Sequence, residues 1–160
     1  MPREDVDGAQ PMTLYWEDFK VGETVALGQH TFAEAEIIAF ARQFDPQPFH
    51  VDVQAARQSF FGGLIASGWH TCAVCMRLNC DSYINRSVSL GSPGLDSIRW
   101  PKPVRPGDTV TYRRTVLEAR ASNSRPRMGL LRSRTEGLNQ HGEVVLSMEG
   151  WGMFGRRPDA

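Results

Sequence analysis

Apolar residues recur at helical spacing early in the chain and alternate with polar residues toward its end. Residues 24–30 alternate and predict a first strand. Residues 31–44, TFAEAEIIAFARQF, follow with a different period. Their apolar members would share one face of an amphipathic helix: Phe32, Ile37, Ile38, Ala41 and Phe44.

Both ends of this first helix carry a sequence signal. Thr31 and Glu34 have the spacing of a capping box, in which two side chains satisfy free backbone N–H groups at a helix start. Pro46 disfavours helical dihedral angles in the residue before it. We therefore expect the helix to end at Phe44 or Asp45.

Two more helical segments follow. Residues 50–59, HVDVQAARQS, predict a short helix with Asp52 as its N-cap. Residues 64–80, LIASGWHTCAVCMRLNC, are apolar nearly all round, which is typical of a helix buried on every side. We expect this central helix to begin near Ser67 and Gly68.

The remainder of the chain predicts strands. Alternating segments are separated by a proline-rich connection, PKPVRPGD, and by an NQHG hairpin turn. The predicted strands are residues 95–100, 109–120, 127–138 and 143–155. The resulting order predicts an α+β fold, in which an antiparallel sheet of about five strands wraps around the central apolar helix.

Length and composition narrow the function classes. A chain of 160 residues predicts one domain, here residues 13–155, with tails at 1–12 and 156–160. Eighteen basic and eighteen acidic residues give a formal net charge of zero, which argues against a dedicated nucleic-acid binder. No apolar run is long enough to span a membrane, and no signal peptide is visible. Three closely spaced cysteines are typical of a reducing compartment, so we expect a cytoplasmic protein.

Candidate chemistry lies where the first helix breaks. Asp45 and His50 are five residues apart, so a continuous helix would point their side chains about 140° apart. Pro46 and Pro48 break the helix and let His50 turn back toward Asp45. The two side chains would then form an acid–imidazole pair, or Asp45 would simply cap a backbone N–H in a proline turn.

These residues resemble a known family. The MaoC-like dehydratases, or R-specific enoyl-CoA hydratases, carry the motif Asp-x-Asn-Pro-x-His-x-Asp, which reads DPQPFHVD at residues 45–52. FGGLIASG at 61–68 and GLDSIRWPKPVRPGDTV at 94–110 resemble further family segments, so the likeness spans residues 14–154. Gln47 stands in the place of the motif's Asn. Met76 stands, by an ungapped count, where some hydratases have a serine.

The resemblance implies a hotdog fold and a hydro-lyase that hydrates an enoyl thioester of coenzyme A. Asp45 and His50 would bind one water, one taking its proton and the other delivering a proton to Cα. The Gly68 N–H, at a helix start, would stabilise the thioester oxyanion, unless this glycine serves only close packing. No metal or redox cofactor is implied, and the protein would form a homodimer or a higher homo-oligomer.

Two other function classes remain open. A hotdog thioesterase usually needs a carboxylate on the central helix, and residues 67–80 contain neither Asp nor Glu. A non-catalytic acyl-thioester binding or assembly subunit would leave Asp45 and His50 idle.

Other suggestive residues have a plainer interpretation. His70, Cys72, Cys75 and Cys80 lack the spacing of a tetrahedral metal site, and small buried thiols are the favoured interpretation. Three cations in the proline-rich region could meet coenzyme A phosphates or belong to a solvated loop: Arg99, Lys102 and Arg105.

Overall fold

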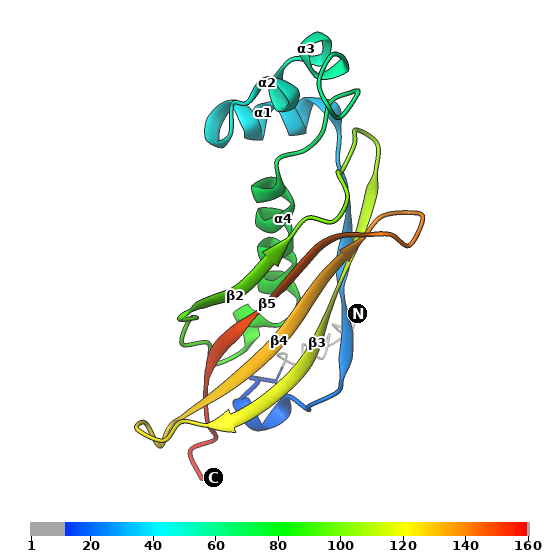
Figure 1. Ribbon diagram of the computed structural model, residues 1–160. Coiled ribbons are helices and arrows are strands. Elements are labelled where there is room, and N and C mark those ends of the chain that lie inside the picture. The colour runs from blue at the N-terminus through cyan, green and yellow to red at the C-terminus, as the bar shows by residue number, and fades with distance from the viewer. Residues whose placement is uncertain (1–11, 160) are drawn as a thin grey trace, which may run out of the picture.

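The long helix α4 lies in the concave face of one antiparallel sheet in this computed structural model, which describes residues 12–159 (Figure 1). The strands are β1 (Thr24–Thr31), β2 (Gly94–Arg99), β3 (Thr109–Ala121), β4 (Met128–Leu138) and β5 (Val144–Gly155). The helices are α1 (Glu34–Phe44), α2 (Pro48–Val51), α3 (Val53–Arg57) and α4 (Gly68–Ser82), with 3-10 turns at Trp16–Asp18 and Ile84–Arg86.

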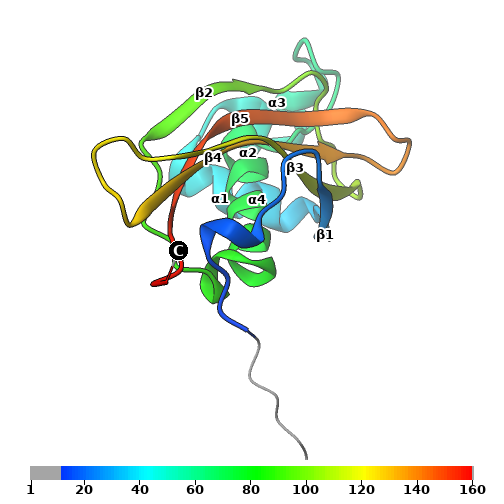
Figure 2. The ribbon, with the colours of Figure 1, turned by 90° about the horizontal axis from the view of Figure 1, so that it is seen from below.

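The sheet has the strand order β1-β3-β4-β5-β2, and all its neighbours are antiparallel. Viewed from below, the strands curve around α4 (Figure 2). The helices α1 to α3 gather at one end of the molecule (Figure 1). This is the hotdog arrangement, so the predicted α+β architecture of five strands around a central helix is confirmed. Within residues 12–159, no helix is both long and apolar enough to cross a membrane.

The core forms where the concave face of the sheet meets α4. Val110, Tyr112 and Val116 alternate along β3 and are almost fully buried. The Tyr112 hydroxyl donates a hydrogen bond to the Thr71 carbonyl at 3.1 Å, which fixes β3 against α4. The alternation seen in the sequence therefore separates the two faces of the sheet correctly.

One face of α4 is covered and the other is not. His70, Thr71, Cys75 and Asn79 are buried, whereas Trp69 and Met76 are 55% and 52% exposed. The prediction of a helix buried on every side is therefore wrong for the single chain. One curved sheet covers only one side of a helix cylinder, and the apolar residues on the opposite side stay accessible.

Two details of the first helix also differ from the prediction. Thr31 is the last residue of β1, where its hydroxyl lies 2.7 Å from that of Thr109, so it forms no capping box with Glu34. The N-cap is Ala33, which makes no side-chain cap. Phe44 is 63% exposed and does not join the buried face. The predicted tail at residues 1–12 lies outside the described residues apart from Met12.

Candidate active site

The break after α1 turns the chain back on itself, as the prolines predict. Asp45 is the C-cap of α1, with φ −153° and ψ 67°, and its N–H donates to the Ala41 carbonyl at 2.8 Å. Pro48 opens α2 at a position where a helix needs no N–H donor. His50 lies within this short helix and is buried. The break therefore returns His50 to the end of α1.

Asp45 and His50 face each other across this turn. The carboxylate Oδ2 of Asp45 lies 3.3 Å from Nε2 of His50. The His50 side chain is 6% exposed and that of Asp45 is 16% exposed. Within the described chain, the carboxylate of Asp45 accepts only from the Gln47 and Ser67 side chains and from no backbone N–H, so the alternative in which this side chain caps a backbone N–H is wrong.

A backbone carbonyl fixes the orientation of the His50 ring. Its Nδ1 lies 2.8 Å from the Ile65 carbonyl oxygen. A carbonyl can only accept, so Nδ1 must carry the proton and donate to it. In the neutral imidazole this leaves Nε2 as a proton acceptor, directed toward Asp45.

The carboxylate of Asp45 is held by two donors. Ser67 Oγ donates to Oδ2 at 2.6 Å, and Gln47 Nε2 donates to Oδ1 at 2.8 Å. Partial burial by itself raises the pKa of Asp45, but these two hydrogen bonds and the nearby His50 outweigh it and lower the pKa below its ordinary value. Asp45 is therefore ionised at neutral pH.

Ser67 also caps the central helix. Its Oγ accepts the Trp69 N–H at 3.3 Å, so one hydroxyl starts α4 and holds the acid. Gly68 is the first residue of α4, and its N–H has no acceptor within residues 12–159. The helix start therefore leaves a free donor next to the acid.

Gly68 has a packing role as well. A Cβ at this position would lie 2.4 Å from Cε2 of Trp100. The indole Nε1 of Trp100 donates to the Gly68 carbonyl at 3.1 Å, which holds the ring against the helix start. Close packing alone therefore explains why residue 68 has no side chain, and the role of its N–H needs a separate test.

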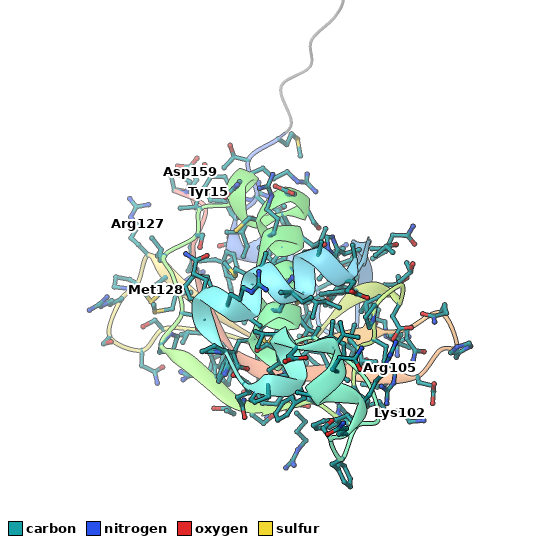
Figure 3. The ribbon with its side chains drawn as sticks, turned by 90° about the horizontal axis from the view of Figure 1, so that it is seen from above. Tyr15, Lys102, Arg105, Arg127, Met128 and Asp159 are labelled. Atoms are coloured by element: carbon teal, nitrogen blue, oxygen red, sulfur yellow. The ribbon has the colours of Figure 1, made fainter. Side chains whose placement is uncertain are left out.

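Asp45, Gln47, His50, Gly68 and Trp100 line one cavity of about 560 Å³. Lys102 and Arg105 also line it, and Figure 3 shows them together on one side of the molecule, away from Tyr15 and Asp159. Arg105 donates to the Phe61 carbonyl at 2.7 Å, and Lys102 forms an ion pair with Glu143. Aromatic and aliphatic residues make up much of the remaining wall: Phe49, Phe60, Phe61, Ile65, Trp69, Trp100, Val104 and Val145.

Comparison with known proteins identifies the family to which this chain belongs. Residues 16–134 match the family described as "MaoC like domain". The chain belongs to the MaoC-like dehydratase family. A solved structure of a MaoC-like dehydratase from Rhodospirillum rubrum matches with a TM-score of 0.83 and 43% identity, covering 91% of this chain and 99% of that one.

Two curated relatives are similar to this MaoC-like chain. An (R)-specific enoyl-CoA hydratase from Rhodospirillum rubrum is 31% identical over 110 residues, which are 64% of this chain and 69% of that protein. Protein MaoC from Klebsiella aerogenes is 28% identical over 120 residues. That match covers 74% of this chain but only 35% of the larger relative.

The structure shows where the two residues that differ from the family pattern, Gln47 and Met76, lie. Gln47, at the Asn position, is one of the two donors to Asp45. Met76, matched by the ungapped count to a helix serine, does not line the cavity of Asp45 but a second one. The hydroxyl beside Asp45 belongs to Ser67, which in the sequence signals only the start of a helix.

A cluster of one carboxylate and two imidazoles, which no local spacing in the sequence signals, connects the elements around the site. Glu36 Oε1 lies 2.5 Å from His30 Nε2 and 2.9 Å from His70 Nε2. Burial lowers the pKa of His70, although Glu36 opposes this shift. The cluster joins β1, α1 and α4, and thereby aligns the helix that ends at Asp45 with the helix that begins after Ser67.

The remaining candidates lie apart from the acid–imidazole pair. Cys72, Cys75 and Cys80 are free thiols, and burial raises the pKa of Cys75 to about 12. A thioesterase would need a carboxylate on the central helix, and the one acidic residue of α4 is Asp81. Asp81 is paired with Arg77 at 2.8 Å and does not line the 560 Å³ cavity.

Proposed function

We propose that this chain is a hydro-lyase that reversibly hydrates an enoyl thioester of coenzyme A to a 3-hydroxyacyl thioester. The observation that carries the proposal is the 3.3 Å approach of Asp45 Oδ2 and His50 Nε2 on the wall of a cavity. Two hydrogen-bond acceptors this close together can both accept from one water that also contacts the substrate. Membership of the MaoC-like family and the enoyl-CoA hydratase relative support the same chemistry.

The protonation states favour His50 as the proton carrier. In hydration, the water oxygen bonds to Cβ of the substrate while one O–H bond breaks and its proton passes to His50 Nε2. The imidazolium then delivers that proton to Cα, and the second hydrogen stays on the new hydroxyl. Asp45 has a lowered pKa and is a poor proton acceptor. It would orient the water and stabilise the imidazolium, and such positioned groups contribute about 10²–10⁴-fold.

The negative charge that develops on the thioester oxygen needs a donor. The Gly68 N–H is free at the start of α4, where the helix dipole also favours an anion. We assign it the oxyanion role, since one such donor is worth roughly 3 kcal/mol. Lys102 and Arg105 line the same cavity, and cations there attract the phosphates of coenzyme A.

Hydration is tested by following the loss of conjugated absorbance of crotonyl-CoA and of longer and branched enoyl-CoAs, with free thiol measured in parallel. We expect hydration without thiol release, and rates at least about 100-fold lower for Asp45→Asn and His50→Ala. Thiol release would instead favour a thioesterase. Equal rates for the wild type and both variants would contradict the proposed roles.

The oxyanion role can be separated from packing. Proline is favoured at the first position of a helix, and Ser67, with φ −57° and ψ 137°, has the extended backbone that a following proline requires. In a Trp100→Ala background, which removes the clashing ring, Gly68→Ala keeps the N–H and Gly68→Pro removes it. We expect the proline variant to be about 100-fold slower than the alanine variant. Equal rates would remove Gly68 from the mechanism.

We also propose that two copies associate through β2. This strand forms one edge of the sheet, and Leu95 within it is 51% exposed. Trp69 and Met76 leave an apolar surface on α4. An exposed edge strand is a site for strand pairing with another chain. Sedimentation equilibrium should give a dimer, and a monomer at every concentration would contradict this assembly.

A further inference from the structure

A second cavity, of about 350 Å³, lies further along α4. Its lining continues that of the first cavity along two elements: α4 passes from Thr71 to Cys72, and β5 from Val145 to Met148. The two cavities therefore follow one another between the helix and the sheet. Apolar residues make up much of the second wall: Met76, Ile84, Leu95, Leu131, Met148, Trp151 and Phe154.

One cation interrupts this apolar wall. Arg114 occupies the inward position on β3 between Tyr112 and Val116, and it is only 5% exposed. Within the described chain, its Nε and Nη1 have no hydrogen-bond partner and no carboxylate forms an ion pair with it. The guanidinium lies over the ring of Tyr83, 3.9 Å from the centroid, and 5.0 Å from that of Phe19.

A buried guanidinium without an anion is unfavourable for the ligand-free fold. Arginine stays protonated in proteins, and a buried charge that lacks a partner is strongly destabilising. The two aromatic rings offset part of this cost, but Nε and Nη1 remain without an acceptor within the described chain. An unbranched apolar side chain would fill the same position without the penalty, so Arg114 has the properties of a ligand-binding residue.

Polar groups around Arg114 complete a small anion site. Thr135 is its cross-strand neighbour on β4, is 8% exposed and lines the same cavity. Asn79 lines it from α4, with Nδ2 donating to Cys75 Sγ at 3.6 Å and Oδ1 without a partner within the described chain. A half-turn of the Asn79 amide would let the Cys75 thiol donate to Oδ1 and direct Nδ2 at an anion.

We propose that the second cavity binds the distal end of an apolar acyl chain that terminates in a carboxylate, with Arg114 as its bidentate partner. A planar guanidinium matches a carboxylate in this way. The inference rests on the proposed function and deepens it, because the substrate would be the enoyl thioester of a dicarboxylic acid. The apolar wall takes the methylene chain, and Thr135 and Asn79 flank the carboxylate.

The length of the acyl chain follows from the helix. Gly68 and Asn79 both lie on α4, and their separation along the axis is roughly 16 Å at 1.5 Å per residue. An extended chain advances about 1.2 Å per bond, since three backbone bonds span about 3.5 Å. The reach of the Arg114 side chain shortens the gap. A chain on the order of ten carbons therefore fits between the thioester at Gly68 and the guanidinium.

The first experiment compares two substrates that differ only at the far end. Wild type, Arg114→Met and Arg113→Met are given ten-carbon trans-2-enoyl-CoA thioesters ending in a methyl or a carboxylate group. Arg113 is the matched control, because it lies on the other face of β3, 47% exposed and paired with Glu136. We expect wild type and Arg113→Met to favour the carboxylate substrate by about 10–100-fold in kcat/KM. Arg114→Met should lose that preference, and an unchanged preference would overturn the proposal.

The second experiment needs no turnover. Calorimetry compares the binding of saturated ten-carbon acyl-CoA ending in carboxylate, the methyl-ended decanoyl-CoA and free decanoate. Tighter binding of the carboxylate-ended thioester, lost in Arg114→Met, supports the inference even if no enoyl-CoA is hydrated, in which case the proposed function alone fails. Equal binding of the two thioesters, with Arg114-dependent binding of decanoate, would assign the cavity to free fatty acids and overturn the inference.

A purely structural role for Arg114 predicts a different pattern. If Arg114 serves only to stack on Tyr83 and Phe19, Arg114→Met should lower the urea midpoint and leave the substrate preference unchanged. The binding role predicts the reverse, with an equal or higher midpoint in the ligand-free variant and the preference abolished.

Discussion

Ser67→Ala tests the hydroxyl that joins the central helix to the catalytic acid. Ser67 is fully buried, and its Oγ both donates to Asp45 Oδ2 at 2.6 Å and accepts the Trp69 N–H at 3.3 Å. Alanine removes both contacts and adds no atom to the core. The change therefore leaves packing nearly intact and acts on two identified hydrogen bonds.

The magnitude follows from those two contacts. A hydrogen bond to a charged group contributes about 1.5–3 kcal/mol, and the long N-cap contact belongs at the lower end of the usual range, about 0.5–1 kcal/mol. We therefore expect Ser67→Ala to lose about 2–4 kcal/mol of unfolding free energy at neutral pH. Because the pKa of Asp45 is lower in the folded than in the unfolded chain, its ionised carboxylate stabilises the fold at pH values above the ordinary pKa of 3.8. This stabilisation is lost as the pH falls through the pKa of the folded state. The difference from wild type should shrink accordingly in acid.

Urea unfolding at neutral and acid pH measures the stability change, and the pH profile of kcat/KM for an enoyl-CoA measures the effect on Asp45. Without the Ser67 donor, the pKa of Asp45 rises, so the acid limb should move to higher pH. Ser122→Ala is the matched control, because Ser122 Oγ also accepts a backbone N–H, from Arg125 at 3.1 Å, but contacts no carboxylate. A loss below about 0.5 kcal/mol or an unmoved acid limb would refute this account of Ser67.

Three further changes have defined outcomes. Gly68→Ala places a Cβ 2.4 Å from the Trp100 ring. Urea unfolding should therefore show a loss of about 1–2 kcal/mol of unfolding free energy, and adding Trp100→Ala should reverse it. Full stability of Gly68→Ala with Trp100 present would contradict the close packing of these two residues. Burial lowers the pKa of His70 below its ordinary value of 6.5, although Glu36 opposes this shift. As pH falls below 6.5, the imidazole is therefore protonated more readily in the unfolded chain than in the folded one, and the wild type should lose stability. His70→Phe should flatten that slope in urea unfolding across a pH series, and an unchanged slope would exclude His70 as its cause. Asp52→Ala removes the cap to the Gln54 and Ala55 N–H groups at 2.9 and 3.1 Å and should cost about 1 kcal/mol with hydration unchanged; a large loss of hydration would place Asp52 in the site.

The features that the sequence predicts well are those with local causes. Pro46 ends α1 because a proline constrains the residue before it. Asp52 caps α3, because a short polar side chain satisfies free N–H groups, and α4 begins at Gly68, close to the predicted start. The approach of Asp45 and His50 belongs to the same class, since both lie within one short turn.

The features that it misses depend on contacts between distant segments. Ser67 reaches Asp45 from 22 residues away, and no local spacing signals that contact. Thr31 has the letters of a capping box, but pairing with Thr109 extends β1 through it. The strand TVTYRRTVLEAR alternates as predicted, yet strict alternation places one of its adjacent arginines inside. The alternation of β3 therefore already signals an inward Arg114 two residues after Tyr112.

The most direct test of the central claim is a double-mutant cycle on hydration. The central claim is that Asp45 and His50 act together on one water. The rate of absorbance loss with an enoyl-CoA substrate is measured for wild type, Asp45→Asn, His50→Gln and the double variant. We expect each single change to lower kcat/KM by about 10²–10⁴-fold and the double variant to be hardly slower than the slower single one, because the groups act as a unit. Losses that multiply, or no loss in either single variant, would contradict the shared water.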